Sequence, residues 1–127
     1  MFSQAHFMEI ANELYKYRGD DFLCDTVLIA SDRVLKAHSV LLAAVSPVFK
    51  SAFESNGGPG MYHINLPDFN STTLEIALNF IYTGKLLLPS KYTEPGELSK
   101  LFASLQDLGL ELKTLNGCEM RFQGSVS

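Results

Sequence analysis

Tryptophan is absent from this chain of 127 residues, and cysteine and histidine are scarce. The two cysteines, Cys24 and Cys118, cannot form a disulfide framework, and neither has a second Cys or His at zinc-ligand spacing. Cys24 lies in an apolar stretch, which is typical of a reduced intracellular protein. We therefore expect no metal site and no cofactor.

Positive charge is also in short supply. Ten Lys and Arg residues are scattered among fourteen Asp and Glu residues, which gives a formal net charge of −4. A domain that binds nucleic acid through phosphates needs clustered cations, so we expect no direct nucleic-acid binding by this segment. No apolar run approaches the roughly 20 residues of a membrane span, and the N-terminus lacks a signal-peptide pattern. We expect no membrane partner.

The sequence also lacks a recognisable catalytic group. His38 and Ser39 are adjacent, and adjacent side chains on a helix or strand point apart, whereas a Ser–His pair needs hydrogen-bond contact and a third orienting group. No Gly-x-Ser-x-Gly elbow is present, and no Lys-Ser or Lys-Thr closes the glycines at 57, 58 and 60 into a phosphate loop. His38 is predicted to be a core histidine satisfied by backbone groups. We predict that the chain is not an enzyme.

Apolar residues make up 46% of the chain, enough for the core of one domain. The first predicted helix carries an apolar face at helical spacing, with Phe7, Ile10, Ala11, Leu14 and Tyr15. Strands are predicted at 23–30 and 33–37, joined by a turn at Ser31–Asp32, and again at 62–66 and 86–88. Pro47 is expected to divide residues 39–53 into two short helices, with Ser46 as the cap of the second.

The second half of the chain is predicted to be mostly helical. Residues 70–73, Asn-Ser-Thr-Thr, supply several possible caps for the next helix, and Thr72 with Glu75 fits a capping box; the helix is expected to end at Gly84. Another spans 98–108 and stops at Gly109, and a short one is expected at 111–115. We predict an α+β domain over residues 1–117 and a weakly ordered tail over 118–127.

Three segments, in this order, resemble the BTB/POZ family. They are Phe22-Leu-Cys-Asp-Thr-Val-Leu-Ile29, Leu35-Lys-Ala-His-Ser-Val-Leu-Leu-Ala-Ala-Val-Ser-Pro-Val-Phe49 followed by Phe53, and Phe80-Ile-Tyr-Thr-Gly84. Their order and spacing agree with the predicted elements, and the resemblance covers about residues 6–110. It implies a helical cluster capped by a small β-sheet, and a role in protein–protein interaction.

The helix before the first strand is similar to the dimerisation helix of zinc-finger transcription regulators and kelch-type adaptors. The apolar residues of this helix come before those of the compact core in the sequence, and they need another surface to cover them. A symmetric contact with a second copy of the chain is the commonest way to supply one. We expect a homodimer whose interface contains Phe7, Ile10, Ala11 and Leu14. Only residues 1–5 are left for the exchanged strand of many relatives, so an open sheet edge is expected to permit weak tetramers or pairing with another BTB domain.

The resemblance implies two further sites. The family's charged pocket combines a strand aspartate, here Asp25, with a basic residue after Ala-His, where this chain has Ser39. An unpaired buried carboxylate is costly, so Asp25 is expected to be hydrogen-bonded or partly hydrated, with Lys36 nearby in sequence. A groove between subunits would bind corepressor peptides, and its candidate residues are Glu13, Lys16, Tyr17, Asp20, Ala43, Val45 and Lys50.

Two functions follow from the resemblance. The first is a dimerisation and corepressor-recruitment domain of a nuclear zinc-finger transcription regulator. The alternative is a substrate adaptor for a cullin ubiquitin ligase. Adaptors of that class carry a hydrophobic-x-Glu element where this chain has the glycine-rich segment 56–60, which favours the first function.

Overall fold

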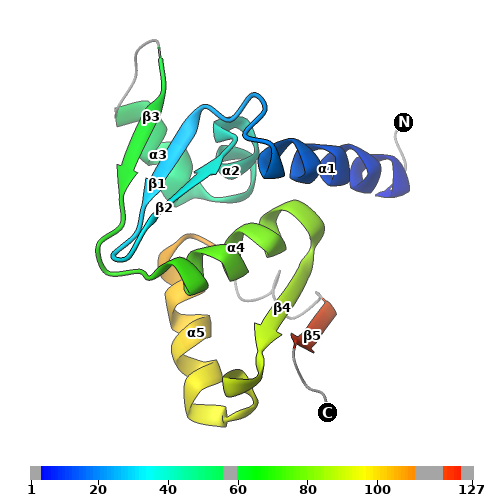
Figure 1. Ribbon diagram of the computed structural model, residues 1–127, viewed down its shortest axis with the longest axis vertical. Coiled ribbons are helices and arrows are strands. Elements are labelled where there is room, and N and C mark those ends of the chain that lie inside the picture. Colours follow the sequence, from blue (N-terminus) through cyan, green and yellow to red (C-terminus); the bar gives the residue numbers. More distant parts are fainter. Residues whose placement is uncertain (1–3, 56–59, 111–118, 124–127) are drawn as a thin grey trace.

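The computed structural model describes residues 4–55, 60–110 and 119–123. Helices surround one apolar core, with a three-stranded sheet towards one end of the molecule and a two-stranded sheet towards the other (Figure 1). The first helix, α1 (Gln4–Gly19), extends sideways from this body with its N-terminal end outermost. The predicted α+β fold, a helical cluster with a small sheet, is confirmed.

The three-stranded sheet has the order β2-β1-β3. β1 (Thr26–Ile29) pairs antiparallel with β2 (Val34–Ala37) and parallel with β3 (Tyr62–Asn65). The strand predicted from residue 23 begins only at 26, because the residues before it form a tight turn that hydrogen-bonds back to the end of α1. In this turn Asp21 and Leu23 have positive φ angles of 57° and 59°.

Pro47 divides the helical segment after the hairpin as predicted. α2 (Ser39–Val45) ends before it, and α3 (Pro47–Ser55) begins with it. Ser46 Oγ accepts a hydrogen bond from Phe49 N at 3.2 Å, so its predicted role as the helix cap is confirmed. The same hydroxyl donates to Leu108 O at 2.6 Å, and this bond ties the cap to the C-terminal part of the domain.

α4 (Ser71–Thr83) lies at the centre of the molecule and is buried over most of its length. The predicted capping box of Thr72 with Glu75 is wrong. Asn70 caps the helix instead, since its side chain accepts from Thr73 N at 2.8 Å. The predicted stop at Gly84 is confirmed by its left-handed φ of 78°.

The chain then forms β4 (Lys85–Pro89), the 3-10 turn η1 (Ser90–Thr93) and α5 (Pro95–Asp107). β4 contains the predicted short strand, whereas η1 was not predicted. Past α5, Gly109 has a φ of 87°, and a Cβ placed there would lie 2.3 Å from Ser46 Oγ. Glycine is therefore required at this position by both conformation and space.

The last described segment, β5 (Glu119–Gln123), pairs parallel with β4. It lies inside the segment expected to be a weakly ordered tail, and the structure differs there because β4 offers backbone groups that a neighbouring strand satisfies. The domain boundary at 117 stays a prediction. The helix predicted at 111–115 and Cys118 lie outside the described residues.

The outer edge of β2 is partly covered by α1. Ala30 N donates to Arg33 O at 3.0 Å, which sets a hairpin pairing in which the backbone groups of Val34 and Lys36 point away from β1. Arg18 Nε donates to Lys36 O at 2.8 Å and so occupies one of these edge groups. Strand addition at β2 is therefore obstructed.

The outer edge of β3 has no further strand within the described residues, and His63 and Asn65 are exposed there. An open edge of this kind is the feature on which the expected weak tetramer depends. Higher assembly stays a prediction.

Candidate dimer and peptide interface

The C-terminal half of α1 is fastened to the body. The Tyr15 hydroxyl donates a hydrogen bond to Asn79 Oδ1, and the centroids of the Tyr15 and Tyr82 rings lie 5.7 Å apart. Arg18 Nη2 contacts Glu75 Oε1 at 2.6 Å, and only 13% of the Arg18 side chain is exposed. These contacts join α1 to α4 and hold the helix at a fixed angle to the core.

The N-terminal half of α1 leaves apolar side chains uncovered. Met8 is 49% exposed and Ile10 is 47% exposed, whereas Ala11 and Leu14 are half-buried. Leu14 packs against the core of its own subunit. Of the four predicted dimer residues, Ile10 is therefore the most accessible described one, and the side chain of Phe7 lies outside the described part.

One side of α1 forms an open hollow of about 330 Å³. Its walls combine apolar and acidic side chains of the helix, and the residues are His6, Glu9, Ile10, Glu13, Leu14 and Tyr17. The hollow thus brings two predicted dimer residues together with two predicted groove residues. Tyr17 extends this apolar surface to Phe22, because their ring centroids lie 5.0 Å apart in a T-shaped arrangement.

The other groove residues are spread more widely. Lys16 is exposed on α1, with its Nζ 3.1 Å from Glu13 Oε1, and Asp20 is exposed just after the helix. Ala43 and Val45 pack partly against the core, and Lys50 is exposed on α3. A groove that joins α1 with α2 and α3 needs a second subunit to complete it, so it stays a prediction.

Asp25 and Ser39 are in direct contact at the predicted charged pocket. Asp25 Oδ1 accepts from Ser39 N at 2.7 Å, and Oδ2 accepts from Ser39 Oγ at 2.6 Å. Burial acts against the charged carboxylate, but the hydrogen bonds from Ser39 and Thr26 outweigh it, so the pKa of Asp25 lies below its ordinary value. The expectation that Asp25 is hydrogen-bonded is confirmed, while Lys36 instead faces Asp21 at 3.7 Å.

His38 is buried and hydrogen-bonded, as predicted, although only one ring partner is a backbone group. Its Nε2 lies 3.0 Å from Phe22 O, and its Nδ1 lies 2.6 Å from the Tyr82 hydroxyl, which also accepts from His38 N at 3.0 Å. A proton on Nε2 satisfies all three bonds at once. Burial raises the pKa of Tyr82 to about 12, so this hydroxyl remains a donor at neutral pH. The network fixes the turn after α1 to α2 and α4.

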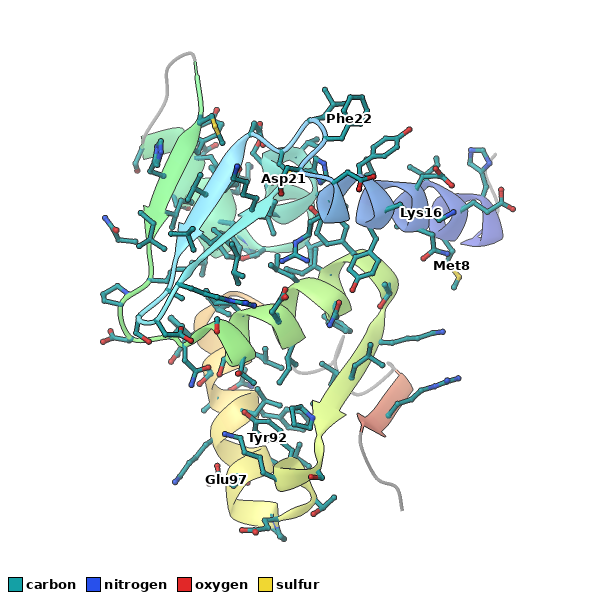
Figure 2. The ribbon with its side chains drawn as sticks, viewed as in Figure 1. Met8, Lys16, Asp21, Phe22, Tyr92 and Glu97 are labelled. Carbon is teal, nitrogen blue, oxygen red and sulfur yellow. The ribbon has the colours of Figure 1, made fainter. Side chains whose placement is uncertain are left out.

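The sequence predicts a turn at Gly19 and Asp20–Asp21, but the turn between α1 and β1 continues to Leu23. Phe22 and Leu23 are 52% and 68% exposed, and Figure 2 shows Phe22 projecting from this turn. A leucine with positive φ is strained by roughly 1–2 kcal/mol. The β-branched and aliphatic residues from 23 to 30 predict a strand that starts at 23, and no local signal extends the predicted turn to Phe22 and Leu23.

Neither a metal-ligand cluster nor a membrane-spanning helix is found in the part of the chain that the structure describes. Within residues 4–55, 60–110 and 119–123, no three His, Cys, Asp or Glu side chains gather as a set of metal ligands. No helix of that part of the chain has both the length and the apolar character to cross a bilayer. Cys24 is half-buried, and desolvation together with the Asp21 carboxylate raises the pKa of its thiol.

Comparison with known proteins gives consistent matches. Hypermethylated in cancer 2 protein of Mus musculus is 31% identical over 100 residues, which are 79% of this chain and 16% of that protein. Kelch-like protein 8 of Caenorhabditis elegans is 33% identical over 88 residues, which are 68% of this chain and 13% of that protein. The chain thus spans 13–16% of the length of these curated relatives.

The fold agrees with a solved structure, the BTB domain of zebrafish PATZ1. The TM-score is 0.64 at 20% sequence identity, and the match covers 85% of this chain and 94% of that one. The family model of the BTB/POZ domain matches residues 14–111. The chain therefore belongs to the BTB/POZ family of protein-interaction domains.

Proposed function

We propose that this domain forms a homodimer through α1 and that the dimer recruits other proteins. The single observation that carries the proposal is the exposed side chain of Ile10, 47% exposed on the projecting helix α1 and on the same side of it as Leu14 and Tyr17. Exposed apolar groups of this kind, rimmed by charged residues, are typical of an interaction surface.

The energetics indicate that the interface extends beyond this side chain. Completing the burial of one half-exposed side chain contributes about 1 kcal/mol, given roughly 1.5–3 kcal/mol for full burial of a large apolar side chain. Association costs roughly 4–15 kcal/mol in lost freedom of motion. Further contacts are needed, and Tyr17 with Phe22 continues the same apolar strip towards the sheet.

Sedimentation analysis of Ile10→Asp tests the homodimer. We expect the parent to sediment as a dimer at micromolar concentration and the variant as a folded monomer, because Ile10 makes few contacts within its own subunit. Met61→Asp is the matched control, since Met61 is 46% exposed just before β3 and belongs neither to α1 nor to the candidate groove residues. A parent that remains monomeric, or an Ile10→Asp protein that remains as dimeric as the control, contradicts the proposal.

We further propose that the dimer binds corepressor peptides in the nucleus, as the domain of a zinc-finger transcription regulator. The resemblance of the leading helix to that class supports this, together with the open hollow that Glu13 and Tyr17 share with the dimer residues. The expected result is that a corepressor peptide panel binds the parent and not Tyr17→Ala. If the peptides bind the parent and Tyr17→Ala equally well, their binding site does not include Tyr17.

A cullin adaptor role is the second candidate, and the 33% identity with kelch-like protein 8 favours it. A pulldown with a purified cullin N-terminal domain separates the two functions. Retention of the cullin by the parent domain, without binding to the corepressor peptides, selects the adaptor.

A further inference from the structure

The exposed side of α4 carries a row of polar residues. Thr72 is exposed, and Glu75, Asn79 and Thr83 are half-buried, whereas the other residues of the helix are buried. From Thr72 to Thr83 the helix rises about 16 Å. That length equals about five residues of extended chain.

Two open hollows lie along this row and adjoin at Leu87 of β4. The first has a volume of about 170 Å³, and Arg33 and Asn79 are among its lining residues. The second has a volume of about 340 Å³, and Tyr15 and Lys85 are among its lining residues. Leu87 lines both hollows, and the hydrogen bond from the Tyr15 hydroxyl to Asn79 Oδ1 joins their walls. We call this surface, from Arg33 to Lys85, the α4 furrow.

The Arg33 end of the furrow carries more positive than negative charge. A further hollow of about 340 Å³ adjoins it there, lined by Arg33 together with Arg18, Asp21 and Lys36. Glu75 Oε1 lies 2.6 Å from Arg18 Nη2, and Glu75 Oε2 lies 3.5 Å from Arg33 Nη2, so two guanidinium groups share one carboxylate. Lys36 Nζ lies 3.7 Å from Asp21 Oδ2. Three cations against two carboxylates leave this end with an excess of positive charge.

The other end of the furrow is also positive. Lys85 and Arg121 both line its hollow. Arg121 is level with Leu87 in the pairing of β4 with β5, and Lys85 lies two residues before Leu87, so all three belong to one face of the two-stranded sheet. Among the described side chains that line this hollow, none is a carboxylate. An anionic group placed here is attracted by both cations.

Folding thus brings together positive charge that is scattered along the sequence. The furrow and the adjoining hollow hold five of the ten Lys and Arg residues but only two of the fourteen Asp and Glu residues. The chain as a whole has a net charge of −4. A ligand that this side of the domain attracts is therefore one that carries negative charge.

The furrow also offers apolar contacts. Met8 lines the hollow at the Lys85 end and is 49% exposed, and Figure 2 shows it on the side of α1 that faces β4. Leu87 is half-buried where the two hollows adjoin. Because methionine is flexible, it adapts to apolar side chains of different shape. A ligand that fits the furrow therefore has apolar groups beside its acidic ones.

We propose that the α4 furrow binds an extended acidic segment of a partner protein, with carboxylates near the cations of both ends and apolar side chains against Met8 and Leu87. A nucleic acid fits less well, because its evenly spaced phosphates would also meet Glu75 and because the domain as a whole is negatively charged. The furrow differs from the surface proposed for the homodimer, since Ile10 lines another hollow of α1. It is complete within one subunit, so binding does not require the dimer.

Fluorescence polarisation with labelled peptides tests this site. The probe is a peptide of about eight residues in which glutamate alternates with leucine, long enough to span the furrow. The comparison peptide has lysine in place of every glutamate. We expect the parent domain to bind the acidic probe and not the basic peptide, and to bind the probe more weakly as the salt concentration rises. Arg33→Glu and Lys85→Glu, at opposite ends of the furrow, should each weaken binding about tenfold.

Lys100→Glu is the matched control, because it makes the same change in charge at an exposed position of α5 and should bind the probe like the parent. Thermal melts check that each variant is folded, and the methyl NMR signal of Met8 should shift when the acidic probe is added. A parent that does not bind the probe, or a loss of binding in Lys100→Glu equal to that in Lys85→Glu, contradicts the proposal.

Two other outcomes also overturn it by identifying a different occupant. If the parent binds a DNA oligonucleotide in preference to the acidic probe, the furrow is a nucleic-acid site. If Lys85→Glu changes the sedimentation of the domain and the parent does not bind the probe, the furrow is a contact between copies of this chain.

Discussion

Tyr82→Phe removes a buried hydroxyl that is hydrogen-bonded to two atoms of His38. Tyr82 is 1% exposed, and its hydroxyl donates to His38 Nδ1 at 2.6 Å while accepting from His38 N at 3.0 Å. His38 in turn holds Phe22 O, on the turn that connects α1 to the sheet. The substitution leaves the aromatic ring in place, so any loss of stability comes from the polar contacts.

The magnitude follows from what the substitution leaves behind. His38 N–H and Nδ1 are both buried, and each loses its partner without gaining water. A buried donor or acceptor without a partner costs about 1–3 kcal/mol, so the expected loss is about 2–5 kcal/mol. Domains of this size are stable by about 5–15 kcal/mol, and the variant should therefore unfold at a clearly lower urea concentration.

Urea unfolding at neutral pH measures this loss, with Tyr62→Phe as the control. Tyr62 is half-buried, and its ring packs edge-on against Phe53 at 4.7 Å, so removal of its hydroxyl should cost about 0.5 kcal/mol or less. A Tyr82→Phe protein as stable as this control refutes the reasoning. It would show that relaxation or water satisfies His38 at little cost.

The same hydroxyl predicts an alkaline limit. The pKa of Tyr82 is about 12 in the folded chain against an ordinary value of 10.0, so the unfolded chain loses this proton first as the pH rises. The contribution of Tyr82 is complete below about pH 10 and is lost as the pH approaches 12. Tyr82→Phe should lack this component of the alkaline decline in the same urea assay.

Three other substitutions test polar contacts and backbone conformation at the ends of helices. Ser39→Ala should bring the pKa of Asp25 back towards its ordinary value. The lowered pKa stabilises the fold above the ordinary value, and this stabilisation is lost as the pH falls through the folded pKa, so the variant should lose less stability on acidification. An unchanged Asp25 titration, followed by NMR, would contradict this. Gly109→Ala should cost about 2–3 kcal/mol, because it adds left-handed strain and displaces Ser46 Oγ from its hydrogen bonds. Gly84 also has a left-handed φ, but a Cβ added there would meet open space, so Gly84→Ala should lower the free energy of unfolding by about half as much in the same urea assay.

Features determined by local chemistry were predictable from the sequence. Pro47 divides its helical segment because proline cannot supply the backbone donor, and Ser46 caps the second helix for the same local reason. The burial of His38 followed from its apolar neighbours, and the hydrogen bonding of Asp25 followed from the cost of an unsatisfied carboxylate.

Features that depend on distant partners were not predictable. The sequence offers Asn70 among several caps but cannot choose between them: Thr72 and Glu75 have the spacing of a capping box, whereas Glu75 is held by Arg18, from 57 residues earlier, and Asn70 is the cap. The left-handed turn at Leu23 depends on the His38 network, and β5 depends on the free edge of β4. From the sequence, Phe7, Leu14 and Ile10 are all predicted to lie in the dimer interface, whereas in the structure Leu14 already packs against the core of its own subunit.

The two hydrogen-bonded aspartates indicate where partner specificity resides. Asp32 repeats the arrangement of Asp25 at the other end of the hairpin: its carboxylate accepts from Ser71 N at 2.7 Å and from Ser71 Oγ at 2.6 Å, and these bonds lower its pKa. Each aspartate thus satisfies the first residue of a helix, α2 for Asp25 and α4 for Asp32. With Ser39 in place of the family's basic residue, the Asp25 pocket serves as a helix cap, and its polar groups are committed within the subunit. Glu9, Glu13 and Lys16 on α1 are exposed, and the contact of Lys16 with Glu13 lies within the helix itself, so we expect partner choice in this domain to depend on α1.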